Sequence, residues 1–82
     1  MPTGIQRVGA VVNTAQGLAV VRASDASYPD LGTSVIDERL DTVGEVVDVF
    51  GPVDRPFVAV SPASETQLAP LLGTVVYARS DG

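Results

Sequence analysis

The sequence predicts an all-β domain, a small antiparallel barrel of about six strands, and two observations lead to this fold class. Short runs rich in valine recur along the chain, and glycine, proline or aspartate separates each run from the next. Evenly spaced strands with turn signals between them are typical of a sandwich or a barrel, and no segment has the period of a long helix. Because closure pairs every strand edge, we expect a closed or nearly closed barrel.

The clearest element is a β-hairpin over residues 42–60, TVGEVVDVFGPVDRPFVAV. Its arms, residues 43–50 and 56–60, are rich in Val and Phe, which suit a pleated and half-buried surface. Gly51 tolerates backbone conformations closed to other residues, and Pro52 fixes its own φ near −65° and lacks an N–H. The chain is therefore expected to reverse at Gly51 and Pro52.

Both faces of this hairpin carry large apolar side chains. Strict alternation divides the first arm into two faces, Glu45, Val47 and Val49 on one and Gly44, Val46, Asp48 and Phe50 on the other. A sheet with one dry side should instead alternate apolar and polar residues cleanly. Two explanations remain open: a partner covers part of the outer face, or the chain's own loops cover it.

Four further segments complete the strand count. Residues 7–13 and 18–23 form a hairpin around a turn at 14–17, where Gly17 is free to take positive φ. Residues 35–36 make a short third strand and residues 74–79 the last one. In the first strand, Val8, Ala10 and Val12 are predicted to share one face. In the last strand, one face is predicted to carry Val75 and Tyr77 and the other Thr74, Val76 and Ala78. We expect one domain over residues 1–82, with its core at about 7–79.

Three irregular segments separate these strands. In residues 24–34, Tyr28 and Leu31 either reach a partner or fold back as a lid over an open barrel end. Residues 37–41 are predicted to be a solvated turn, because nothing nearby completes the oxygen cage of a metal site. Residues 61–72 are expected to contain one helical turn, with a weak capping box from Ser64 to Gln67.

Composition excludes several classes of function. The chain has no cysteine and no histidine, which removes disulfides, thiol nucleophiles and the usual zinc, haem and iron–sulfur ligands. No apolar run approaches the roughly 20 residues of a membrane span. The N-terminus MPTGIQRVGA lacks the charged start and apolar middle of a signal peptide, so we expect a cytoplasmic protein.

The charge balance bears on partners and habitat. Ten acidic residues face five arginines and no lysine, for a net charge of −5 and a pI near 4.2. The arginines are spread along the chain, so we expect weak direct binding to RNA or DNA. An acidic, lysine-free surface also suits a high-salt cytoplasm, where its self-repulsion is screened. The alternative is an ordinary acidic domain.

Catalysis is not expected of this chain. A serine nucleophile would need a base, and the chain has neither histidine nor lysine. Paired carboxylates must converge in a pocket, yet strict alternation places Glu45 and Asp48 on opposite faces. No glycine stands in a phosphate-binding motif, so no cofactor is predicted either.

The motif of the central hairpin nevertheless points to a family. Residues 43–60, preceded by LGTSVIDERL and followed further on by GTVVYAR, closely resemble the GAR-type accessory protein of H/ACA ribonucleoproteins in its short archaeal form. The resemblance runs from Val8 to Arg79, and its most specific part is the pattern VGxVxDVFGPVxxPxVAV. The matching positions are Gly44, Asp48, Phe50, Gly51, Pro52, Val53 and Pro56, with Val35 and Asp37 upstream and Gly73 and Tyr77 downstream. Residues 61–72 have no distinctive match, and the acidity exceeds the family's usual balance.

This resemblance implies a fold and a task. The fold would be a six-stranded barrel of the kind found in the second domain of translation elongation factors. The task would be to bind the catalytic domain of the dyskerin-type pseudouridine synthase, without a catalytic group and without touching the guide RNA. In that family the subunit influences the synthase's mobile thumb loop, and so substrate loading and product release during pseudouridylation of rRNA. It implies no membrane and no DNA as partner.

The resemblance and the two-sided hairpin together predict the interface residues. These are Val49, Phe50, Gly51, Pro52, Val53 and Pro56, at or beside the contact with the synthase. In the alternative, Val49 and Phe50 belong to the core and Gly51 and Pro52 only form the turn. Gly44 is expected to allow close backbone approach inside the barrel.

Two other interpretations remain at this point. Barrels of the PRC type carry a GxVxDV strand similar to residues 44–49, which would imply an adaptor in ribosome maturation or in a photosynthetic or membrane assembly. The FGPV that follows favours the first family. A detached enzyme domain that binds a flavin or a nucleotide is the third possibility.

Overall fold

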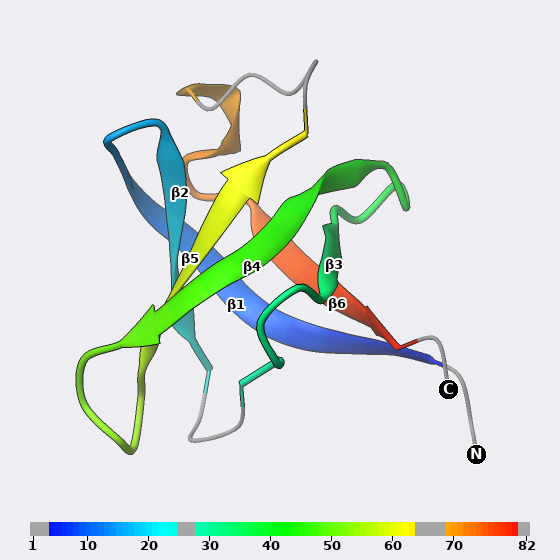
Figure 1. The fold of residues 1–82 in the computed structure, drawn as a ribbon. Coiled ribbons are helices and arrows are strands. Elements are labelled where there is room, and N and C mark those ends of the chain that lie inside the picture. Colours follow the sequence, from blue (N-terminus) through cyan, green and yellow to red (C-terminus); the bar gives the residue numbers. More distant parts are fainter. Residues whose placement is uncertain (1–3, 25–27, 64–68, 81–82) are drawn as a thin grey trace.

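Six antiparallel strands close into a barrel in the computed structural model, which describes residues 4–24, 28–63 and 69–80 (Figure 1). Around the barrel the strands lie in the order β1-β2-β5-β4-β3-β6. Their bounds are β1 Gly4–Ala15, β2 Leu18–Ala23, β3 Ser34–Ile36, β4 Thr42–Phe50, β5 Phe57–Pro62 and β6 Val75–Ser80. The predicted fold class is confirmed.

The first hairpin turns more tightly than expected. Ala15 pairs with Leu18, so only Gln16 and Gly17 form the loop, and both have positive φ, 55° and 77°. Two central residues with positive φ match the right-handed twist of the flanking strands. β1 also begins at Gly4 rather than at residue 7, because its first residues pair with β6 as far as Ser80.

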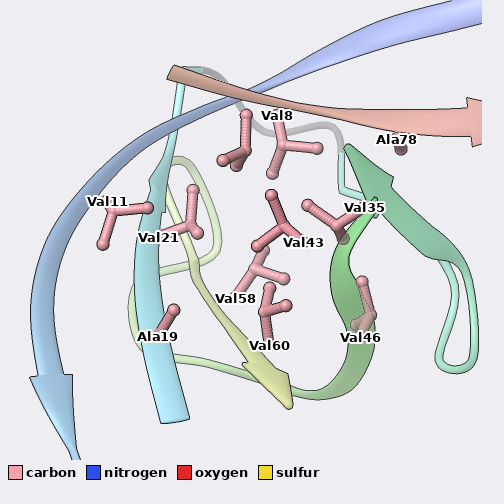
Figure 2. Close-up of a cluster of buried hydrophobic side chains, with 11 residues drawn as sticks. Val8, Val11, Ala19, Val21, Val35, Val43, Val46, Val58, Val60 and Ala78 are labelled. Carbon is pink, nitrogen blue, oxygen red and sulfur yellow. The ribbon is translucent and has the colours of Figure 1, made fainter. Parts of the chain in front are cut away.

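The core consists of small aliphatic side chains from all six strands, which converge in the barrel interior (Figure 2). Valine and alanine fill the cluster: Val8, Val11, Ala19, Val21, Val35, Val43, Val46, Val58, Val60, Val76 and Ala78. Burying a valine contributes about 1.5–3 kcal/mol, and β-branched side chains suit strands. Val76 and Ala78, which are predicted to share one face of the last strand, both lie in the core.

The face predicted for β1 is wrong. Val11 lies in the core at 2% exposure, whereas Val12 is 51% exposed and Ala10 is half-buried. The register of β1 against β6 shifts between Arg7 and Gly9, before Val11, and this shift accounts for the change of face. Against β2 the register shifts again between Val11 and Asn13, so Val12 is the extra residue of a β-bulge. A bulge changes which residues face inward, and strict alternation cannot anticipate it.

A bulge in β4 also changes which side chains face outward. The register against β5 shifts between Val46 and Asp48, so Val47 is the extra residue. Val46 is buried, whereas Val47 and Asp48 are both exposed. Glu45 pairs with Ser61 and Asp48 pairs with Ala59. Ser61 and Ala59 are the neighbours of Val60 in β5, and because Val60 faces the core, both face outward. These two carboxylates therefore share the outer face, and their predicted separation is wrong.

Neither Tyr28 nor Leu31 covers the end of the barrel. Tyr28 and Leu31 are 57% and 66% exposed, so the hypothesis of a lid is wrong. Beyond them the chain is fixed beside β4, because the Gly32 amide donates to the Val46 carbonyl and the Val46 amide donates to the Thr33 carbonyl, at 2.7 and 3.0 Å.

The other two irregular segments lie at strand connections. Residues 37–41 form the predicted turn: the Asp37 carboxylate accepts the Arg39 and Asp41 amides at 2.8 and 3.0 Å. A 3-10 helix, η1 (Ala69–Leu71), packs Leu71 against the core. The capping box proposed at Ser64 and Gln67 lies outside the described residues. Within those residues, no helix is long and apolar enough to cross a membrane.

Candidate partner interface

The six residues predicted for the interface lie together at the turn that joins β4 to β5 (Figure 1). They line one open depression with a volume of about 380 Å³, and Tyr28 from the preceding loop lines it as well. We call this set the β4–β5 patch: Val49, Phe50, Gly51, Pro52, Val53 and Pro56. The structure thus gathers all six predicted residues in one place.

The members of the patch differ in what they offer to a partner. Val53 is 90% exposed and Phe50 is 45% exposed, so both present apolar surface to the outside. Val49 is half-buried and packs against the core. Pro56 lines the depression but is buried, and its carbonyl accepts the Ala23 amide, so it offers little surface to a partner. Gly51 and Pro52 are exposed as well, so the apolar side chains available for contact are those of Phe50, Pro52 and Val53.

Phe50 lies outside the barrel because of the bulge at Val47. Its register partner on β5 is Phe57, and the two rings stack with centroids 5.6 Å apart and an interplanar angle of 23°. Phe57 pairs in turn with Arg22 on β2, whose guanidinium carbon lies 5.1 Å from the Phe57 ring centroid. A row of two aromatic rings and one arginine therefore crosses the outer face from β4 to β2.

Sequence reasoning missed Arg22 and Phe57 as parts of this site. Phe57 could have been found, because in a hairpin that reverses at Gly51 it is the residue that follows the turn opposite Phe50. Arg22 had no comparable signal, since it depends on the pairing of β2 with β5, strands that are not consecutive in the chain.

Gly51 has a conformational role in the turn. Its φ is +90°, a region that residues with a side chain rarely adopt, and an added Cβ would lie 2.7 Å from Cδ2 of Phe57. Glycine at this position therefore lets the chain reverse while Phe57 keeps its place against Phe50.

The described part of the chain offers no metal centre. No group of three or more Asp or Glu side chains gathers there in a way that could hold an ion. A second depression, of about 560 Å³, lies between residues 28–34 and the strands β1 and β6, and Tyr28 is common to both depressions. Asp30 is its acidic residue and Arg79 its basic one. Among the described residues, this lining therefore holds one carboxylate, whereas acid–base catalysis by carboxylates uses a convergent pair.

Comparison with known proteins now decides between the alternatives. The model of the Gar1/Naf1 RNA binding region matches residues 5–81. The chain belongs to the Gar1/Naf1 family. This confirms the resemblance found in the sequence, and the Gar1/Naf1 family is one of accessory proteins of H/ACA ribonucleoproteins rather than a family of enzymes. The PRC-type barrel and the flavin-binding or nucleotide-binding domain are not supported by this match.

A solved structure gives independent support for the fold. The structure described as that of the Gar1 domain of NAf1 superposes with a TM-score of 0.77 at 19% sequence identity. The alignment covers 95% of this chain and 88% of that one. No curated protein sequence matches the chain significantly.

Proposed function

We propose that this Gar1/Naf1 family member is a non-catalytic subunit of the H/ACA ribonucleoprotein that binds the catalytic domain of the dyskerin-type pseudouridine synthase. The contact is made through the β4–β5 patch. By holding the synthase there, the subunit modulates the loading of substrate RNA and the release of product during RNA-guided pseudouridylation of rRNA. The observation that carries the proposal is apolar surface left outside a barrel whose core is already filled.

The energetics of the patch favour a protein partner. Phe50 and Val53 are not needed to fill the interior, because valines and alanines from all six strands already occupy it. An exposed aromatic ring beside other apolar groups is unfavourable in water, and burying it contributes about 25 cal/mol per Å² of apolar area. Aromatic anchors that enter a partner's pocket supply much of the binding energy in protein interfaces.

The family's description as an RNA binding region raises the question of direct RNA contact. The net charge of −5 and the absence of lysine give this chain few groups to neutralise phosphates. We therefore place it in the ribonucleoprotein through the synthase, with the guide RNA contacted only indirectly. The proposal also assigns it to a salt-rich cytoplasm, in keeping with the same charge balance.

Val53→Asp tests the patch without disturbing the barrel. Because Val53 is 90% exposed and lies in the turn, the substitution should leave stability within about 0.5 kcal/mol. It places a charge where a partner would bury it, so binding to the synthase should fall by tenfold or more, about 1.4 kcal/mol. The measurement is titration calorimetry in high salt, with a thermal melt of each variant.

Leu72→Asp is the matched control, since Leu72 is also exposed, at 52%, and lies in a turn beyond η1. It should bind as tightly as the unaltered chain. Absence of any complex between the unaltered chain and the synthase would overturn the proposed function. If Val53→Asp and Leu72→Asp both bind as tightly as the unaltered chain, the interface lies on another face of the barrel.

The proposed effect on turnover needs a separate measurement. Adding the subunit should raise multiple-turnover pseudouridine formation by the guide RNA–synthase complex, because loading and release limit repeated cycles. Val53→Asp should lose this stimulation at concentrations where it no longer binds. A rate that is the same with and without the subunit would contradict the modulatory role.

A further inference from the structure

Arg22 occupies an unusual position next to the β4–β5 patch. It lies on the outer face of β2, half-buried, with its guanidinium carbon 5.1 Å from the centroid of the Phe57 ring. Phe57 stacks in turn on the exposed Phe50. The arginine is therefore held in one orientation by the aromatic row that leads into the patch.

The hydrogen-bonding state of Arg22 is incomplete. Its Nε atom is buried and has no hydrogen-bond partner, and in the described part of the chain no carboxylate pairs with the guanidinium. The chain carries ten acidic residues, yet none of those in the described part forms an ion pair with this arginine. Because Nε is closed to solvent, a partner's acceptor would bind the terminal nitrogens of the guanidinium, which have no hydrogen-bond partner among the described residues either.

A second arginine lies at the same corner. Arg55 precedes β5, and its Nε donates to the carbonyl of Ala23, the residue after Arg22, at 3.4 Å. The Ala23 amide is itself fixed by the Pro56 carbonyl at 2.9 Å. Two of the five arginines of an acidic chain therefore lie where β2 ends and β5 begins, Arg22 on β2 and Arg55 bonded to the residue after it.

We propose that this arginine corner, Arg22 with Arg55, binds a carboxylate of the synthase beside the β4–β5 patch. The inference rests on the proposed function and adds the chemistry of the partner's surface: an apolar pocket for Phe50 and Val53, with an Asp or Glu next to it. Arginine presents a planar fork of donors that suits a carboxylate, and stacking on Phe57 reduces the side-chain freedom that binding would remove.

A protein carboxylate explains the corner better than an RNA phosphate does. Phosphate binding by nucleic-acid proteins depends on several clustered cations, whereas this corner has two. Exposed Asp48 and Asp54 lie on β4 and in the β4–β5 turn, and both would repel a phosphate backbone. A phosphate backbone carries a row of negative charges past both aspartates, whereas a protein side chain brings one carboxylate to Arg22.

The test compares Arg22 variants in complex formation with the synthase. Arg22→Gln removes the charge, and Arg22→Met also keeps an apolar stem over Phe57, so the fold survives in at least one of them. Both should bind the synthase at least about tenfold more weakly than the unaltered chain, with nearly unchanged melting temperatures. Arg39→Gln, in the exposed turn before β4, is the control and should bind normally.

A second arm identifies the acceptor. Each exposed Asp and Glu of the synthase's catalytic domain is changed to Asn or Gln, and one change should reproduce the Arg22→Met loss. Combined with Arg22→Met, that change should cause little further loss, which is the signature of a direct pair.

Three results would overturn the inference, and each differs from the others. If the unaltered chain and Arg22→Met bind the synthase equally, the arginine corner is not part of the interface although the proposed function stands. If Arg22→Gln weakens binding of isolated guide RNA and leaves synthase binding intact, the corner is a phosphate site. If the unaltered chain forms no complex with the synthase, the proposed function fails and the inference fails with it.

Discussion

Phe50 shows how much one residue's position depends on its neighbours along the strand. Strict alternation groups it with Val46, which is buried, and would place its ring in the core. The extra residue at Val47 reverses that assignment, so the ring lies outside against Phe57 and is 45% exposed. The alternative in which Phe50 belongs to the core is therefore wrong, although its contact with a partner stays a prediction.

Phe50→Ala separates stability from binding. A fully buried Phe→Ala change costs about 3–5 kcal/mol, whereas the half-exposed Phe50 should cost nearer the 0.5–1.5 kcal/mol of an aromatic pair. Urea unfolding measures this difference. The same variant should bind the synthase at least about tenfold more weakly. Ile5→Ala, at 48% exposure on β1, should leave binding unchanged, and equal losses from both variants would count against the patch.

Gly44 makes the opposite point, since its surroundings forbid a side chain. A Cβ at this position would meet the Ser61 carbonyl of β5, and the backbone cannot yield as a side-chain tip can. Close approach of two strands is the use of glycine that the sequence predicted here. Gly44→Ala should lower the free energy of unfolding by about 1–3 kcal/mol, the usual range for overpacking, and urea unfolding measures this loss.

Gly4 provides the matched control for that substitution. It also lies in a strand, but an added Cβ meets nothing within 4 Å. Gly4→Ala should therefore leave the free energy of unfolding within about 0.5 kcal/mol of the original. Similar losses of unfolding free energy at Gly4 and Gly44 would contradict the close approach of β4 and β5 at Gly44.

At the scale of single elements, the bulged strands β1 and β4 decide which side chains reach the surface. The bulge of β1 against β2 adds the exposed Val12, and the bulge of β4 against β5 adds the exposed Val47. In β4 the bulge also turns Asp48 outward, where its carboxylate accepts the Val49 amide at 2.8 Å. Without this bulge, Asp48 would face the core, where burying an unpaired carboxylate is costly.

A pair of alanine substitutions tests which of two adjacent valines of β4 faces the core. Val46 is 1% exposed, so Val46→Ala removes two buried methyl groups and should cost about 1.5–3 kcal/mol. Val47 is 43% exposed, so Val47→Ala should change stability by about 0.5 kcal/mol or less. Chemical denaturation of both variants gives the comparison. A larger loss at Val47 would contradict the assignment of Val46 to the core and Val47 to the surface.

At the scale of the whole molecule, charge and core size limit stability together. The chain has 82 residues, and a domain of this length buries only about 60–65% of the surface its unfolded chain exposes. Its net charge of −5 adds self-repulsion to the folded state, because folding brings the acidic groups closer together. Stability should therefore depend strongly on the ions around it.

Raising KCl from about 0.1 to 1 M should stabilise the isolated domain, because the Debye length falls from about 10 to 3 Å and screens the acidic surface. The melting temperature should rise by about 4–8 °C for each kcal/mol gained. Glu38→Lys and Glu45→Lys, at two exposed positions, should reduce this dependence when combined. A melting temperature that does not change with KCl would contradict the proposed adaptation to salt.

The sequence by itself determined the elements of this protein and its family. The bounds of β2 agree with the prediction residue for residue, and β4 ends at Phe50, immediately before the predicted reversal at Gly51 and Pro52. These features depend on local chemistry: β-branched residues favour strands, and glycine and proline favour turns. The motif around Gly51 carried the family resemblance for the same reason, because it is contiguous in the chain.

Only the tertiary structure decided which face each strand residue occupies and what meets across non-consecutive strands. The bulges at Val12 and Val47 arise where the register between paired strands shifts, and a strand sequence does not reveal its partner's register. Arg22 reaches Phe57 because closure of the barrel places β2 beside β5. Both depend on strand pairs set by the closed sheet, whereas propensity and alternation act along one strand at a time.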